Sequence, residues 1–350
     1  MSPVHCIALL LIVGPASAAL CPLASEADTV GGLKVMTVTG EVPADSLGVA
    51  LPHEHVMVDF IGADRCERSR YDADEVFRAV LPHLKQAREL GLDVLFECTP
   101  QFLARDPALL ARLSRASGVK IVTNTGLYGA AEDRYLPAYA FGETAGQLAD
   151  RWTSEWENGI ESTGIRPGFI KTAVDPEPSA VDTKLVEAAA LTHLRTGLTI
   201  ASHTVSGKAA RMQIDALKKL GVDPSAFVWV HAHVEPDLET HLWAARQGAW
   251  VEYDGLSPAG ANRHVELVTA MRDAGLLNRV LVSHDAGWYS VGEETQNFRP
   301  YDTLFTAFVP ALRAAGFAEE EVTLITRTNP QQAFAIRVRP ARPESANRRD

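Results

Sequence analysis

The stretch Leu47-Gly-Val-Ala-Leu-Pro-His-Glu-His55 shows the pattern that decides the fold, a short apolar run that ends in polar side chains. Segments whose apolar residues recur with helical spacing separate this run from the next ones. Alternation of strand-like and helical segments predicts a parallel sheet with helical crossovers. The chain contains eight such runs, at residues 47–55, 94–99, 120–126, 168–174, 198–204, 227–233, 250–255 and 280–285.

Eight is the strand number of a (β/α)8 TIM barrel, and we predict a single domain of this fold over residues 35–336. Its active site is expected at the carboxyl ends of the strands. A doubly wound open sheet is the alternative, but no G-x-G-x-x-G follows the first run. A strand and turn at 35–44 are expected to close one barrel end. The crossover helices are expected at residues 74–90, 107–116, 183–196, 209–220, 237–247 and 264–274.

The two ends of the chain differ from this pattern. Residues 6–13 form a short apolar run, and Ala16-Ser-Ala18 after it resembles a signal-peptidase site. We therefore predict a signal peptide over 1–19 and export to the periplasm or the medium. Because no Lys or Arg precedes the run, a mis-assigned start codon and a cytoplasmic protein are the alternative. Residues 337–350 are rich in Pro and Arg without apolar periodicity, which predicts a disordered tail.

Composition excludes several classes of protein. With 46% hydrophobic and 22% charged residues the chain is that of an ordinary folded protein. A net charge of −11 and the absence of a basic run before the tail argue against a nucleic-acid partner. The apolar run near the N-terminus is shorter than the roughly 20 residues of a membrane-spanning helix, so no membrane partner is expected. The four cysteines show no C-x-x-C spacing, and Cys98 is expected in the core.

Polar residues with metal-binding chemistry stand at the ends of several runs. His53 and His55 lie on one face of the first strand, because side chains alternate along a strand, although two incidental polar residues explain this pair as well. Lys171 interrupts an apolar strand, where an unpaired ammonium is costly. A structural ion pair, a Schiff-base lysine and a carbamate that bridges two metals would each account for it.

The fifth, sixth and eighth runs end near His203, His231 and Asp285. A lone core histidine explains any one of them, but a metal site explains the combination on five strands. A catalytically inert binding barrel would keep the fold and lack one of these ligands. The intact set therefore favours an enzyme.

With this set, the chain resembles the phosphotriesterase family of the amidohydrolase superfamily from about residue 38 to 334. Residues 39–55 resemble the family's first strand, and Thr328-Asn-Pro330 its closing segment. The resemblance implies a binuclear metal-dependent hydrolase in which a metal-bridging hydroxide attacks the substrate and Asp285 accepts its proton. Zinc is the expected metal, with manganese, cobalt or iron left open. The implied ligands are His53, His55 and Asp285 for the more buried ion, His203 and His231 for the more exposed one, and a carbamylated Lys171 between them.

The chain departs from the family at a proton shuttle. In the family, protons pass from the metal-bound aspartate to a histidine at the end of strand seven and then to an aspartate three residues after the strand-six ligand. Gly255 and Val234 stand at these positions. We therefore expect a carboxyl ester or lactone as substrate, with aryldialkylphosphatase activity as the alternative and a Schiff-base lyase using Lys171 as a rival. His233, Glu235 and Glu252 are candidates for a replacement relay.

Aromatic residues after the third and eighth runs are expected to form the pocket for a small-molecule substrate. Packing of the loops explains these aromatic residues equally well. The short loop at 255–262 predicts no large lid, and the sequence leaves a homodimer open. The expected substrate-binding residues are Tyr128, Trp288, Tyr289 and His233, with Tyr135, Tyr139 and Phe141 nearby. Glu54 and His284 are expected to face away from the metals, and His83, His193, His241 and His264 are expected on helix surfaces.

Overall fold

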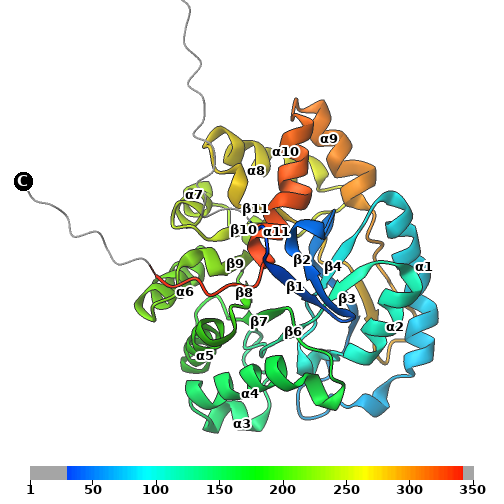
Figure 1. Cartoon of the computed structure of the whole chain (residues 1–350), viewed down its shortest axis with the longest axis vertical. Helices are drawn as coiled ribbons and strands as arrows, with labels where there is room; N and C mark the ends of the chain where they lie inside the picture. The colour runs from blue at the N-terminus through cyan, green and yellow to red at the C-terminus, as the bar shows by residue number, and fades with distance from the viewer. Residues whose placement is uncertain (1–29, 342–350) are drawn as a thin grey trace, which may run out of the picture.

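The computed structural model describes residues 30–341, so the predicted signal peptide lies outside the described residues. Strands gather in the middle of the molecule, and the helices surround them in chain order, from the cyan α1 through the green α4 and α5 to the yellow α8 (Figure 1). Neighbouring barrel strands are parallel. The predicted (β/α)8 barrel is confirmed.

The barrel strands form two hydrogen-bonded sheets, ordered β11-β10-β9-β8-β7-β6 and β12-β3-β4-β5. The sheets share one strand, because β5 and β6 are two halves interrupted only at Thr123. Each predicted run therefore contains a strand. The barrel strands are β3 (Ala50–Val58), β4 (Val94–Glu97), β5 (Lys120–Val122), β6 (Asn124–Thr125), β7 (Phe169–Ala173), β8 (Thr199–His203), β9 (Phe227–Val230), β10 (Trp250–Tyr253) and β11 (Val280–Val282).

The barrel closes between its last and first strands through a bend rather than a continuous ladder. β11 ends before Asp285, whose φ of 53° turns the chain, and β12 (Gly287–Ser290) then pairs with β3. At the bend, the Asp285 amide donates to the carbonyl of His53 over 3.1 Å, and the His55 amide donates to Ala286 over 2.9 Å. Asp285 is therefore held directly beside both histidines of β3.

All six predicted crossover helices are present. In α1, for example, Val76, Val80 and Leu84 form a buried apolar row along one side of the helix. A seventh crossover, α3 (Ala138–Gly142) and α4 (Ala145–Asn158), was not predicted. Ala145, Leu148, Ala149 and Trp152 are buried on one side of α4, so the local signal for this helix was present in the sequence. The six predicted helices are α1 (Ala73–Leu90), α2 (Pro107–Ser117), α5 (Ala180–Thr196), α6 (Gly207–Lys219), α7 (Leu238–Arg246) and α8 (Ala261–Asp273). After β12 the chain adds α9 (Val309–Ala314), α10 (Glu319–Thr323) and α11 (Asn329–Phe334).

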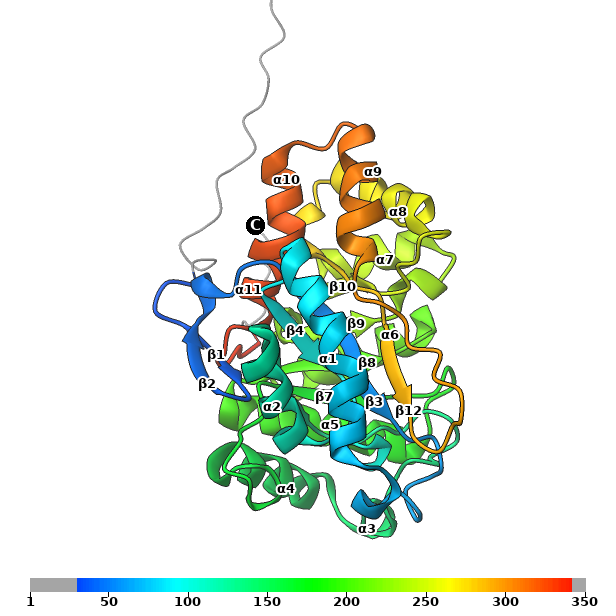
Figure 2. The same cartoon turned by 90° about the vertical axis from the view of Figure 1, so that its right-hand side faces the viewer.

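The inside of the barrel is a packed core below the predicted site. The ring of Phe96 lies 4.1 Å from that of Phe334 and 6.0 Å from that of Phe169, centroid to centroid. Val35 joins the same apolar cluster from the hairpin β1 (Lys34–Thr37) and β2 (Gly40–Pro43), which lies beside α11 (Figure 2). The hairpin and α11 therefore close one end of the barrel, and the carboxyl ends of the strands remain for chemistry.

The expected tail differs from the structure over residues 337–341. The amide of Arg339 donates to Nε2 of His193 over 2.9 Å, and its guanidinium donates to backbone carbonyls at the end of α11. Burial lowers the pKa of Arg339 to about 9. The Arg-rich composition predicts side chains in solvent, but Arg339 is only 5% exposed. It is buried because its guanidinium donates hydrogen bonds to carbonyls at the end of a helix, which have no partner within the helix. Residues 342–350 lie outside the described residues.

The prediction of surface histidines is wrong for three of the four. His193, His241 and His264 are buried. The nitrogens of His241 lie 3.1 Å from the Tyr253 hydroxyl and 3.0 Å from the Glu235 carbonyl, so burial leaves no polar atom of its ring unpaired. His83 is half-buried and stacks on Phe298. Within residues 30–341, no helix combines the length and apolar character that a membrane span requires.

Candidate metal centre

The structure brings all the expected ligands around one cavity at the carboxyl ends of the strands. The cavity has a volume of about 70 Å³. The ligands come from β3, β7, β8 and the segments that follow β9 and β11. They are His53, His55, Lys171, His203, His231 and Asp285.

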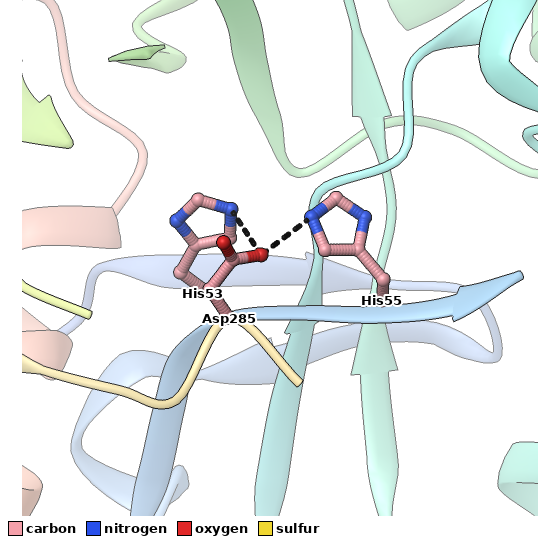
Figure 3. A group of neighbouring side chains, drawn as sticks. All are labelled: His53, His55 and Asp285. Atoms are coloured by element: carbon pink, nitrogen blue, oxygen red, sulfur yellow. Dashed lines mark ion pairs between the residues drawn. The ribbon is translucent and has the colours of Figure 1, made fainter. Parts of the chain in front are cut away.

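Asp285 is shared by the two histidines of β3. Its Oδ1 lies 3.2 Å from Nε2 of His55 and 3.7 Å from Nε2 of His53, and Figure 3 shows both contacts converging on one carboxylate oxygen. Burial raises the pKa of Asp285, but His55 and His53 outweigh it and hold the pKa at about 2. Three ligand atoms within 4.8 Å of one another, one of them anionic, form a group that can hold a metal ion.

A second group of rings stands beside the first. The ring centroids of His203 and His231 are 4.4 Å apart, and His231 lies 5.0 Å from His53. His231, like Asp285, has a positive φ, of 65° and 53° respectively. Non-glycine residues rarely adopt this conformation, and its strain is one of the features found at active sites. Two of the expected ligands therefore depend on strained backbone for their position.

Lys171 is a buried charged residue whose surroundings within residues 30–341 provide no partner for its ammonium group. Its side chain is 1% exposed, and Nζ has no hydrogen-bond partner among the described residues. Burial of His53 and, second to it, the positive charge of Lys171 lower the pKa of His53 to about 4. An unpaired buried ammonium is costly. A carbamate on Nζ would replace that positive charge with two anionic oxygens suited to divalent cations, so the donor set fits two metal ions.

The second ring nitrogen of each histidine has an oxygen neighbour. Nδ1 of His53 lies 2.6 Å and Nδ1 of His231 2.9 Å from the carboxylate of Asp254. Nδ1 of His55 is 2.8 Å from the hydroxyl of Thr99. The Tyr128 hydroxyl lies 3.1 Å from Nδ1 of His203. Because Nδ1 is engaged in all four rings, Nε2 is the nitrogen left for a metal, as is usual for metal-binding histidines.

Asp254 is the main residue that sequence reasoning missed. It follows β10 directly, is fully buried, and contacts a ligand from each metal group. Burial raises its pKa, but His231 and His53 outweigh that effect and hold it well below the usual value. Its place at the end of the seventh run was the available signal.

The two departures from the family's shuttle have different surroundings. Val234 is 51% exposed. A Cβ atom on Gly255 would lie 2.3 Å from Nε2 of His233, so the ring of His233 fills the space that a side chain at 255 would need. Nδ1 of His233 is 3.1 Å from Asp254, and the ring does not line the cavity. His233 therefore belongs to the Asp254 network rather than to the substrate surface where we expected it.

Tyr128 and Trp288 line the cavity as expected, whereas Tyr289 does not. The side chains of β12 alternate, so Tyr289 points away and its hydroxyl donates to Glu75 over 2.8 Å. Phe60 lines the cavity too and was not predicted. Tyr135 packs edge-on against Tyr128, while Tyr139 and Phe141 belong to α3 and do not line the cavity.

Glu54 and His284 face away from the cavity, as expected. The carboxylate of Glu54 accepts from Ser283 and from the amides of His284 and Ala286.

The loop after β10 is short, as expected, since α8 begins at Ala261. A larger cavity of about 560 Å³, lined by Arg246, Arg279 and Arg339 among others, contains none of the expected ligands.

The family model for the "Phosphotriesterase family" matches residues 33–334. A "Phosphotriesterase homology protein" of Escherichia coli (strain K12) is 28% identical over 295 residues, which cover 83% of this chain and 99% of that protein. An "Aryldialkylphosphatase" of Saccharolobus solfataricus is 24% identical over 310 residues, covering 84% and 97%. A solved enzyme, engineered for organophosphate hydrolysis from a weak promiscuous lactonase template, is 26% identical with a TM-score of 0.78 and covers 86% of this chain and 100% of its own.

Proposed function

Because the chain belongs to the phosphotriesterase family, we propose that it is a binuclear zinc hydrolase that acts on carboxyl esters or lactones. The arrangement of six donor residues around one cavity supports metal use. When bound, two divalent cations polarise the C=O of the substrate and lower the pKa of a water molecule held between them. The proposed ligands are the six residues named above, with a carbamylated Lys171 between the two ions.

The preference for esters and lactones concerns the proton that the attacking water loses. Asp285 is the proposed acceptor of this proton, because its pKa of about 2 keeps the carboxylate ionised and its Oδ1 lies at the cavity beside Nε2 of His55. An alkoxide leaving group is strongly basic and takes the proton back from Asp285. A phenolate leaves without it, so turnover of an aryl triester requires a relay that strips Asp285. Val234 and Gly255 provide none at the family's positions.

Aryldialkylphosphatase activity is the second candidate, because a relative of similar length carries that name. The test is kcat/KM on zinc-loaded enzyme for an aryl phosphotriester, an alkyl ester and a lactone. We expect the ester or lactone to be the better substrate by about tenfold or more, with Asp285→Asn inactive on all three. A triester rate near the diffusional ceiling of about 10⁸ M⁻¹s⁻¹ and far above the ester rate would reverse the order of the two candidates.

A Schiff-base lyase is distinguished by a separate experiment. It would use Lys171 Nζ without metal, so it would remain active in chelator and be trapped on substrate by borohydride. We expect activity to be lost in chelator and restored by zinc, without trapping. Elemental analysis of active protein should give two ions per chain, and one ion or none in fully active enzyme would contradict the binuclear proposal.

A further inference from the structure

We propose that the side chain of Phe60 is a selectivity gate that restricts the substrate to short, uncharged acyl groups. This inference rests on the proposed hydrolase function and specifies its substrate class. Phe60 follows the end of β3 by two residues and lines the cavity over the metal ligands. Its side chain is 43% exposed, so it forms part of the surface as well as of the cavity wall.

The gate is completed by aromatic rings from the loop after β6 and from β12. The ring centroid of Phe60 lies 5.4 Å from that of Trp288 and 5.9 Å from that of Tyr135. Tyr135 in turn packs at 5.8 Å on Tyr128, whose hydroxyl reaches His203. Rings in such contacts stabilise one another modestly, by dispersion and edge-to-face attraction. Phe60 therefore joins the loop after β6 to β12 at the wall of the cavity.

Trp288 is the fixed side of this gate. Its backbone has a φ of 70°, and its indole N–H donates to the carbonyl of Asp285 over 3.0 Å. The ring meets His55 edge-on at 5.3 Å, and the guanidinium of Arg299 lies over it at 5.1 Å. Trp288 thus braces the segment that carries a ligand, and removing it would disturb the metal site. It is for this reason a poor position at which to alter specificity.

Phe60 is the side that can be altered. Its backbone carbonyl accepts from Arg134 over 2.9 Å, so the loop is held independently of the side chain. The ring itself contacts the rings of Trp288 and Tyr135. Truncating a partly exposed side chain on a pinned loop should therefore enlarge the cavity without unfolding the protein.

The size and chemistry of the cavity define the substrate class. A volume of about 70 Å³ fits only a handful of water molecules, because one water needs roughly 10–15 Å³ on the same measure, and the two proposed ions would take part of it. Apart from the six metal ligands the walls carry no charged side chain; the remaining lining residues are Val58, Phe60, Thr99, Pro100, Leu103, Tyr128 and Trp288. Such walls accept a short aliphatic acyl group or an unsubstituted lactone and provide no partner for a charged one.

The test compares Phe60→Ala, Phe60→Leu and wild type, each zinc-loaded, on ethyl esters with acyl groups from acetyl to octanoyl, with the acid released followed by titration. A matched control is Phe141→Ala, which removes a ring that is 52% exposed and does not line the cavity. We expect wild type to prefer acetyl to octanoyl, and Phe60→Ala to raise the octanoyl-to-acetyl ratio of kcat/KM by about tenfold or more. Phe60→Leu should be intermediate, and Phe141→Ala should match wild type.

A binding measurement separates failure of the gate from failure of the proposed function. Calorimetry with acetohydroxamate and octanohydroxamate should show tighter binding of the longer probe only in Phe60→Ala, whether or not any ester is hydrolysed. If neither enzyme hydrolyses esters but the binding shift is present, the gate stands and the ester function fails. An unchanged chain-length profile and unchanged octanohydroxamate affinity in Phe60→Ala, or a wild type that already prefers octanoyl, would overturn the gate.

Discussion

Nδ1 of His53 donates a 2.6 Å hydrogen bond to Oδ2 of Asp254. The two residues are 201 positions apart in the sequence. The carboxylate can only accept, so the proton of the His53 ring is on Nδ1 and Nε2 keeps its lone pair toward the cavity. The other carboxylate oxygen does the same for His231 at 2.9 Å. One buried carboxylate therefore orients a ligand of each proposed metal ion.

We predict that Asp254→Asn weakens zinc binding by about 10- to 100-fold, because the amide no longer holds both rings as a charged acceptor. Competition with a chromophoric chelator measures the affinity. Glu252→Gln is the control: burial raises the pKa of Glu252 well above its usual value, so the amide resembles the form already present. An affinity loss of the same size in both variants would mean that Asp254 has no special part in orienting the rings.

Lys171 yields a prediction in the absence of metal. In chelator, Lys171→Met should be more stable than wild type by about 1–3 kcal/mol, because it removes a buried ammonium whose Nζ has no hydrogen-bond partner within residues 30–341. Denaturant unfolding of both metal-free proteins measures this. With zinc present the order should reverse, since the variant cannot form a carbamate. A metal-free wild type that is the more stable of the two would indicate that Lys171 is paired in solution.

Lys171→Ala should also bind fewer metal ions than wild type, as measured by elemental analysis. A short carboxylate such as acetate or propionate fits the space that the truncated side chain leaves and provides the missing oxygens. We therefore expect partial restoration of the second ion by the carboxylate, and no restoration by an alcohol of the same size. Full metal content in the variant without any additive would contradict a bridging role.

His193 leads to a pH-dependent prediction. Burial lowers its pKa from 6.5 to about 4, and the neutral ring donates from Nδ1 to Leu198 and accepts at Nε2 from Arg339. A histidine whose folded pKa is depressed contributes fully above pH 6.5 and loses that contribution as pH falls toward 4. Wild type should therefore lose about 2 kcal/mol between pH 7 and pH 5 that His193→Gln does not lose. Parallel stability curves for the two zinc-loaded proteins would rule this out.

Arg339 should be needed for the end of α11. Its guanidinium donates to the carbonyls of Gln332, Ala333 and Ala335, each over 3.0 Å. Removing it in Arg339→Ala leaves these acceptors without their charged donor, and we expect a loss of roughly 2–4 kcal/mol in the free energy of unfolding. Arg327→Ala, at an exposed arginine, serves as the control and should change stability by less than about 0.5 kcal/mol. Equal stability of the two variants would contradict the capping role.

Local pattern in the sequence was sufficient for the barrel and, together with the family resemblance, for its proposed ligands. Apolar runs with helical segments between them determine which residues form strands, and the alternation of side chains places His53 and His55 on one face. Because parallel strands present their carboxyl ends at one rim, residues at those ends meet whatever their separation along the chain. The helix α4 was not predicted, although its buried residues Leu148 and Trp152 recur with helical spacing, so no lack of local signal explains this omission.

What only the tertiary structure decided is which side chains meet across that rim. Asp254 reaches His53 and His231, Phe60 meets Trp288, and Arg339 turns back onto α11. The positive φ of Asp285 turns its carboxylate toward β3 instead of continuing the strand. No local pattern encodes these contacts, because each depends on the packing of elements that are distant in sequence. The chain's own periodicity determines the barrel and the rim, whereas the distances between strands determine how the rim's residues orient and enclose the site.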